Sequence, residues 1–148
     1  MQPTATVLVY SDDATTREQV RLAGGTSLAR GAKGEGRRPA SDVQEIRYLE
    51  CATLPAVLEA LEERHVDVCV LDGETAPAGG MGVCRQIKDE IYDCPPVLLL
   101  IGRPQDAWLA TWSRAEATVS HPVDPVALAE SLAGLLREQA AEGRLARA

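Results

Sequence analysis

The sequence has few of the residues that build metal or redox sites. It contains two histidines, His65 and His121, far apart in the chain, and its four cysteines form no CxxC pair. Neither set has the spacing of zinc ligands. Aromatic residues make up 3% of the chain, phenylalanine is absent, and no apolar run is long enough to span a bilayer. These absences argue against a zinc protein and against a membrane-spanning chain.

Composition and charge further limit the class of protein that this sequence can encode. A chain of 148 residues is long enough to form one domain with a buried core. Its formal net charge of −7 argues against general nucleic-acid binding. The N-terminus MQPTATVLVY lacks the pattern of a secretory signal, so we expect a cytoplasmic protein. Cys69 and Cys84 fall among apolar residues and are expected to be buried small hydrophobes.

Short apolar runs alternate with amphipathic segments along the chain. The predicted strands span residues 6–10, 45–49, 66–71, 96–101 and 117–119. The third and fourth runs, VDVCVL and PVLLLI, are almost entirely apolar, as strands covered by helices on both faces require. Such alternation predicts an α/β fold with a parallel sheet between two helical layers.

Five helices are predicted between and after these strands. The sequence TTRE from Thr15 predicts a capping box that opens the first helix. Apolar residues at helical spacing place the second helix at 53–64 and the third around 83–91. A short fourth helix carries two tryptophans, and Asp124 followed by proline predicts the start of the last helix.

Three carboxylates follow predicted strands. Asp12 and Asp13 come directly after the first strand, and Asp72 follows the third in VLDGE. In open α/β sheets the functional crevice lies at the carboxyl ends of the strands, so we expect these side chains in one pocket. Adjacent carboxylates repel unless they are solvated or hold a cation. Three separate, solvated carboxylates are the alternative.

One stretch does not fit a compact unit. Residues 23–42, AGGTSLARGAKGEGRRPASD, are rich in glycine and arginine, which predicts a long flexible loop inserted between the first helix and the second strand. A basic docking site for an acidic partner is the alternative. We expect a single domain over residues 1–140 and a tail at 141–148 that is too short for an effector domain.

Five pieces of sequence occur in an order that points to a known family. They are YSDD, VLDGE with Asp72, Gly80 ahead of a helix, PPVLLLIG and HPVDPVAL. With them the chain resembles the receiver domain of two-component response regulators, over almost its whole length outside 23–42, and its composition is similar to that of stand-alone actinobacterial receivers. The resemblance implies a flavodoxin-like (βα)5 three-layer sandwich with the sheet order 2-1-3-4-5.

The resemblance also implies phosphorelay signal transduction by a chain that is not itself an enzyme. Asp72 would take a phosphoryl group from a histidine kinase or a small phosphodonor. Asp12, Asp13 and Asp72, with the backbone carbonyl of Glu74, would hold Mg²⁺. The ion would neutralise charge on the transferring phosphoryl group.

Three positions depart from the family pattern. Ile101 stands where the family has a hydroxyl residue, and its branched side chain is expected to face the pocket, while Gly102 keeps the usual small residue. His121 replaces the lysine before a proline; imidazole is shorter and only partly charged near neutral pH, and a structural hydrogen bond is the alternative role. Thr118 replaces the aromatic residue that normally moves with the switch. The acceptor positions are therefore retained and the switch positions are degenerate.

The output is expected to be a protein contact, without DNA or membrane binding. Trp108 and Trp112 lie on the fourth helix, so a partner or homodimer surface over the fourth helix, fifth strand and fifth helix is predicted; burial of both indoles is the alternative. A phosphorylation-independent binding module is the second functional hypothesis. An aspartyl-nucleophile phosphatase is not favoured, because Glu74 stands where that class needs a second aspartate.

Overall fold

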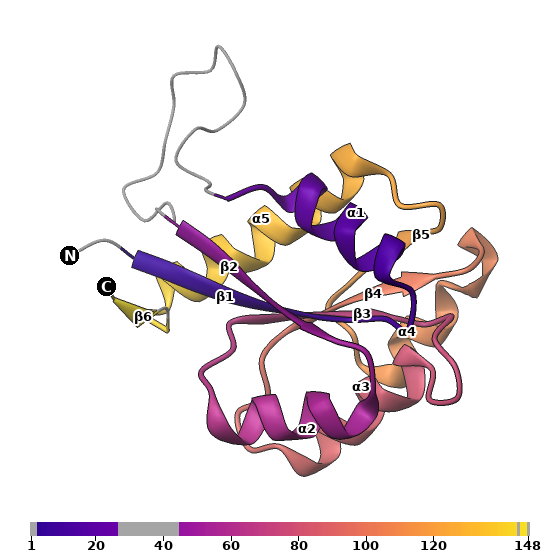
Figure 1. Cartoon of the computed structure of the whole chain (residues 1–148), viewed down its shortest axis with the longest axis horizontal. Helices are drawn as coiled ribbons and strands as arrows, with labels where there is room; N and C mark the ends of the chain where they lie inside the picture. Colours follow the sequence, from indigo (N-terminus) through magenta and orange to yellow (C-terminus); the bar gives the residue numbers. More distant parts are fainter. Residues whose placement is uncertain (1–2, 27–44, 145, 148) are drawn as a thin grey trace.

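A computed structural model describes residues 3–26, 45–144 and 146–147. Its sheet has five parallel strands in the order β2-β1-β3-β4-β5 (Figure 1), which confirms the predicted fold and strand order. The strands are β1 (Pro3–Tyr10), β2 (Glu45–Cys51), β3 (Val68–Asp72), β4 (Val97–Ile101) and β5 (Ala117–Ser120). A two-residue strand that the sequence did not predict, β6 (Ala146–Arg147), pairs antiparallel with β1. Part of the predicted C-terminal tail therefore joins the sheet.

The helices form a layer on each face of this sheet (Figure 1). On one face lie α1 (Ala14–Gly24) and α5 (Pro125–Ala141); on the other lie α2 (Leu54–Glu63) and α3 (Gly80–Glu90). The short α4 (Trp108–Ser113) packs beside α3 after a 3₁₀ turn, η1 (Pro104–Asp106). Among the described helices, none is both long and apolar enough to cross a membrane.

The core is divided into two apolar layers by the sheet. Every residue of β3 and β4 is buried, as their continuous apolar sequences predict. Alternate side chains enter opposite layers: Val70 and Leu98 pack in the layer of α5, and Leu71 and Leu99 pack in the other. Burial of each large aliphatic side chain contributes about 1.5–3 kcal/mol. The carboxyl ends of these central strands are therefore firmly placed, and the site is built on them.

Helix starts agree with the sequence except at α1. Thr53 and Asp124 cap α2 and α5 through their side chains, as predicted. The predicted capping box at Thr15 is wrong, because α1 begins at Ala14 and its N-cap is Asp13. The Asp13 Oδ1 accepts the Thr15 N–H at 2.9 Å. Both residue types are good N-caps, and the one nearer the strand end is used.

The predicted loop at 23–42 begins later than expected. Helix α1 continues to Gly24, and Gly25 ends it with a positive φ of 77° and an N–H bond to the Arg21 carbonyl. From residue 27 onward the predicted loop lies outside the described residues.

The cysteines are free thiols, and Cys69 and Cys84 are buried as predicted. Burial raises the pKa of the Cys84 thiol to about 11 and that of Cys69 well above its usual value. Both are therefore poor nucleophiles.

Candidate functional site

Asp72 is the last residue of β3, the central strand, and only 2% of its surface is exposed. Its Oδ1 accepts the Glu74 N–H at 2.9 Å and lies 2.8 Å from the Nε2 of His121. Its Oδ2 accepts the hydroxyl of Ser11 at 2.8 Å. A buried carboxylate is costly unless it is hydrogen-bonded, and these three groups, from three parts of the chain, supply the partners.

Ser11 is the member of this cluster that the sequence reasoning missed. It follows β1 directly, is completely buried, and donates to Asp72 while its oxygen accepts the Asp13 N–H at 3.0 Å. Its own N–H donates to the Cys51 carbonyl at the end of β2. The signal in the sequence was its place between a buried strand and an acidic pair, where a small hydroxyl can satisfy both neighbours.

The acidic pair divides into two roles. The Oδ2 of Asp12 accepts the Ala76 N–H, and the Asp12 N–H donates to the Thr75 hydroxyl, both at 3.3 Å. Asp12 thus ties the end of β1 to the loop that follows Asp72. The Asp13 carboxylate instead caps α1. In the described part of the chain no hydrogen bond or ion pair joins either carboxylate to Asp72, and no three His, Cys, Asp or Glu side chains are grouped to hold a metal.

Tyr10 shows the effect of the negative charges at the carboxyl ends of the strands. It is buried, and its hydroxyl donates to the Ala78 carbonyl at 2.6 Å. Its pKa is raised, first by burial and then by the negative charges of Asp12 and Asp72. Both carboxylates therefore act on the same buried phenol, and the site carries negative potential.

His121 lies just after β5, and 22% of its side chain is exposed. The backbone N–H of His121 donates to the Ile101 carbonyl at 2.8 Å, which holds His121 beside the end of β4. The imidazole thereby reaches Asp72 from two strands away.

The remaining switch positions differ in how they meet the site. Ile101 is 1% exposed and belongs to the apolar layer that contains Leu99 and Ala110. It is therefore closed off from solvent, and the expectation that it faces the phosphoryl pocket stays a prediction. Thr118 is half-buried on β5, opposite Leu99. Gly102 follows β4, and the Glu74 carboxylate lies against it.

Gly80, the first residue of α3, passes close to the acceptor. A Cβ at this position would lie 2.7 Å from the carbonyl carbon and oxygen of Asp72. Since real Cβ atoms do not approach backbone this closely, glycine is required for α3 to begin against the end of β3.

Both tryptophans of α4 are exposed, which decides between the two alternatives left open by the sequence. The exposed fractions are 68% for Trp108 and 48% for Trp112. The Arg85 guanidinium lies 4.8 Å from the centroid of the Trp112 ring and donates to the Trp112 carbonyl at 2.6 Å. This cation–π contact holds Trp112 and leaves Trp108 as the freer aromatic surface.

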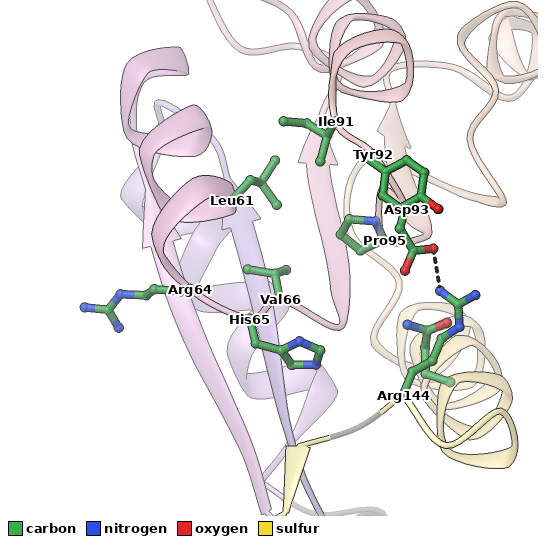
Figure 2. Close-up of a pocket in the computed structure, with 10 residues that line it drawn as sticks. Leu61, Arg64, His65, Val66, Ile91, Tyr92, Asp93, Pro95 and Arg144 are labelled. Atoms are coloured by element: carbon green, nitrogen blue, oxygen red, sulfur yellow. Dashed lines mark hydrogen bonds and ion pairs between the residues drawn. The ribbon is translucent and has the colours of Figure 1, made fainter.

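A concave region lies at the opposite, amino-terminal edge of the strands (Figure 2). Its volume is about 360 Å³, and it is lined by the end of α2, the loop before β4 and the end of α5. An ion pair at 2.8 Å between Asp93 and Arg144 crosses it. None of the predicted site residues lines this cleft.

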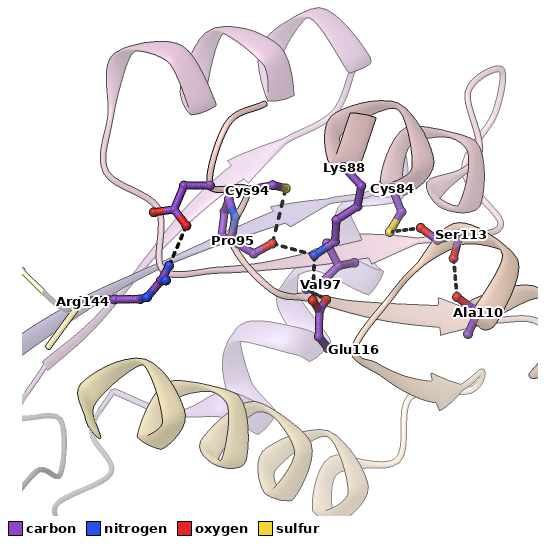
Figure 3. A network of polar contacts seen from close by, with 10 residues as sticks. Cys84, Lys88, Cys94, Pro95, Val97, Ala110, Ser113, Glu116 and Arg144 are labelled. Carbon is purple, nitrogen blue, oxygen red and sulfur yellow. Dashed lines mark hydrogen bonds and ion pairs between the residues drawn. The ribbon is translucent and has the colours of Figure 1, made fainter. Parts of the chain in front are cut away.

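A polar network braces the same edge (Figure 3). Lys88 of α3 donates to the Glu116 Oε2 at 2.7 Å, and the Glu116 Oε1 accepts the Val97 N–H at 2.7 Å. Glu116 thus links α3 and the start of β4 to the start of β5. These contacts are structural, and they lie away from Asp72.

Comparison with known proteins gives the family. No family model matches the chain. Two curated relatives, both named uncharacterized response regulatory proteins, come from the CDC 1551 / Oshkosh and H37Rv strains of Mycobacterium tuberculosis. Each is 46% identical over 134 residues, which cover 90% of this chain and 92% of the relative.

Solved structures show the same fold at low identity. The chain is similar to the receiver domain of the Francisella response regulator 1452, with a TM-score of 0.69 and 14% identity over 91% of this chain and 98% of that one. It is also similar to the chemotaxis response regulator CheY4 of Vibrio cholerae, with a TM-score of 0.68 and 18% identity over 90% and 99% of the two chains. From the 46% identity and this shared fold, the chain belongs to the response regulators and has their receiver-domain fold.

Proposed function

We propose that this receiver accepts a phosphoryl group on Asp72, from a histidine kinase or a small phosphodonor, in a phosphorelay. The observation that carries the proposal is the placement of Asp72. It is a buried carboxylate at the carboxyl end of the central strand, with the His121 Nε2 2.8 Å from its Oδ1. The crevice of an open α/β sheet is found at this edge.

The transfer is a displacement at phosphorus. A carboxylate oxygen of Asp72 forms the new bond to phosphorus, and the bond from phosphorus to the donor nitrogen or oxygen breaks, with its electron pair leaving on the donor. The imidazole of His121, already at the carboxylate, would donate a hydrogen bond to the phosphoryl oxygens. It would take the place of the lysine in the family pattern.

The oxygen atoms at this edge fit Mg²⁺. The ion prefers oxygen ligands, keeps several waters, and is commonly held by one or two carboxylates plus phosphate. Asp12 is exposed, and among the described residues the Asp72 Oδ2 accepts one hydrogen bond, from Ser11, and so retains a lone pair. We propose that Asp12, Asp13 and Asp72, with the backbone carbonyl of Glu74, would hold the ion, since the cap of α1 uses only the Oδ1 of Asp13. When bound, the ion would offset the charge of the carboxylates and of the phosphoryl group.

The output of the proposed receiver is a contact with a protein partner or a second copy through α4, β5 and α5. Trp108 on α4 is 68% exposed, and exposed tryptophan is enriched among interface anchors. The proposed location is the cytoplasm, and neither DNA binding nor enzymatic activity is proposed. Because Ile101 is buried and cannot donate a hydrogen bond to a phosphoryl oxygen, the conformational response to phosphorylation is proposed to be small.

A phosphorylation-independent binding module is the second candidate. It is favoured by the same burial of Ile101 together with the exposure of Trp108, since a fixed α4 face can bind a partner without a switch.

The test is the intact mass after incubation with Mg²⁺ and acetyl phosphate, for wild type and Asp72→Asn. One added phosphoryl group on wild type alone is the expected result. Absence of an adduct, under conditions where an ordinary receiver is labelled, would refute phosphorylation of Asp72 and favour the binding module.

A further inference from the structure

The side chain of Glu74 occupies an unusual position beside the acceptor. Its carboxylate lies against Gly102, at the end of β4: a Cβ on Gly102 would lie 2.7 Å from the Glu74 Oε2 and 2.9 Å from its Cδ. The Glu74 carboxylate therefore fills the space that a side chain at position 102 would take.

This position lies across the strand ends from which Asp72 is presented. The Glu74 N–H donates to the Asp72 Oδ1, and the Gly73 N–H donates to the Leu100 carbonyl of β4. The backbone of Glu74 therefore lies in the loop after Asp72, and its side chain extends to the end of β4. The carboxylate bridges the two strand ends between which a phosphoryl group on Asp72 must be accommodated.

The contact is also easy to release. Glu74 is exposed, and among the described residues its carboxylate makes no hydrogen bond or ion pair. Arg103, the nearby cation that feels its charge, is paired with Asp106 at 2.8 Å. The Glu74 carboxylate therefore adds negative charge, without an ion pair of its own, beside a site that must receive a group carrying about two negative charges.

We propose that Glu74 controls the access of the phosphoryl group to Asp72. Its carboxylate occupies the space over Gly102 and repels an incoming anion, so the side chain must turn out to solvent before transfer. The inference rests on the proposed function, because it concerns the same acceptor.

Gly102 offers a second way to move the same side chain. The atoms that a Cβ at 102 would strike are the far end of a flexible side chain, so Glu74 can yield cheaply. Gly102→Ala and Glu74→Ala should therefore act through one event, and their effects should not add.

The experiment measures the rate of labelling by acetyl phosphate with Mg²⁺, followed by intact mass. The variants are Glu74→Ala, Glu74→Gln, Gly102→Ala and the double variant, and Glu59→Ala is the matched control because Glu59 is an exposed acid on α2. Glu74→Ala should label at least threefold faster than wild type, Gly102→Ala faster than wild type but slower than Glu74→Ala because its methyl group takes part of the vacated space, the double variant no faster than Glu74→Ala, and the control at the wild-type rate. Glu74→Gln separates charge from bulk, and a rate near that of Glu74→Ala would assign the effect to charge.

Equal labelling of wild type and both Glu74 variants would overturn the inference and leave the proposed function standing. Multiplicative effects in the double variant would overturn the shared mechanism. No labelling of any variant would overturn the proposed function and this inference together, whereas measurable labelling of wild type and faster labelling of Glu74→Ala would support both.

Discussion

The two altered switch positions give the sharpest test of how this site departs from its family. We expect the double variant Ile101→Thr with His121→Lys to bind beryllofluoride, a phosphoryl mimic, more tightly than wild type. His121 already lies 2.8 Å from Asp72, so the longer side chain of the His121→Lys variant can reach a group attached there. The Ile101→Thr variant supplies a hydroxyl next to Gly102, at the end of β4.

The magnitude follows from the bonds gained. A hydrogen bond to a charged group contributes about 1.5–3 kcal/mol, and each 1.4 kcal/mol is about tenfold in affinity. We therefore expect about tenfold from Ile101→Thr, which adds a bond, and a smaller gain from His121→Lys, which replaces the proposed imidazole bond by one from a fully charged group. Ile101→Thr also removes apolar contact from a residue that is 1% exposed and buries a hydroxyl, so we expect it to lower the free energy of unfolding by about 2 kcal/mol.

The assay is a beryllofluoride titration with Mg²⁺, followed by amide NMR shifts of Gly73 and Gly102, with stability measured separately by urea unfolding. Ile101→Val and His121→Gln are the matched controls, since they change size without adding the hydroxyl or the ammonium group. If the double variant binds the mimic no better than wild type while it remains folded, the explanation given for the two departures is refuted.

Three further predictions concern stability in urea. Ser11→Ala removes a buried donor to Asp72, and we expect the free energy of unfolding to fall by about 2 kcal/mol, whereas an unchanged value would contradict the role of Ser11. Burial raises the pKa of the Asp67 carboxyl in the folded state, so the folded protein binds a proton there at pH values where the unfolded chain has lost it. The free energy of unfolding of wild type should therefore fall relative to that of Asp67→Asn as pH rises from about 4 through the raised pKa. Parallel pH profiles of the two proteins would contradict this prediction. Lys88→Met should cost about 1 kcal/mol but Glu116→Ala about 2–3 kcal/mol, because only the latter strands a buried backbone N–H; equal costs would disprove the assignment.

The fold was predictable because its signals are local and continuous. The apolar runs that became β3 and β4 could only be strands covered on both faces, and they are buried throughout. Asp72 and His121 were placed by motifs at strand ends, where position in the chain largely fixes position in a parallel sheet. The proline after Asp124 likewise marked the start of α5.

The errors share a different cause. Asp13 and Thr15 are both good helix caps, and only the strand end decides between them. The direction of the Glu74 carboxylate depends on the absent side chain of Gly102, on another strand. Ser11 donates to Asp72 although the two residues are 61 positions apart in the sequence. Such choices depend on tertiary contacts, which periodicity and spacing do not encode.

The burial of Ile101 also bears on how a signal would leave this protein. In the proposed mechanism a phosphoryl group can change the α4 face by moving the end of β4. That end carries Ile101, which is enclosed in the apolar layer containing Ala110 of α4, and Trp112 is held by Arg85. Moving α4 would disrupt this packing, and residue 101 has no hydroxyl that could form a compensating hydrogen bond to the phosphoryl group. We therefore expect a partner on the Trp108 face to bind with similar affinity before and after phosphorylation, as the small conformational response proposed above implies.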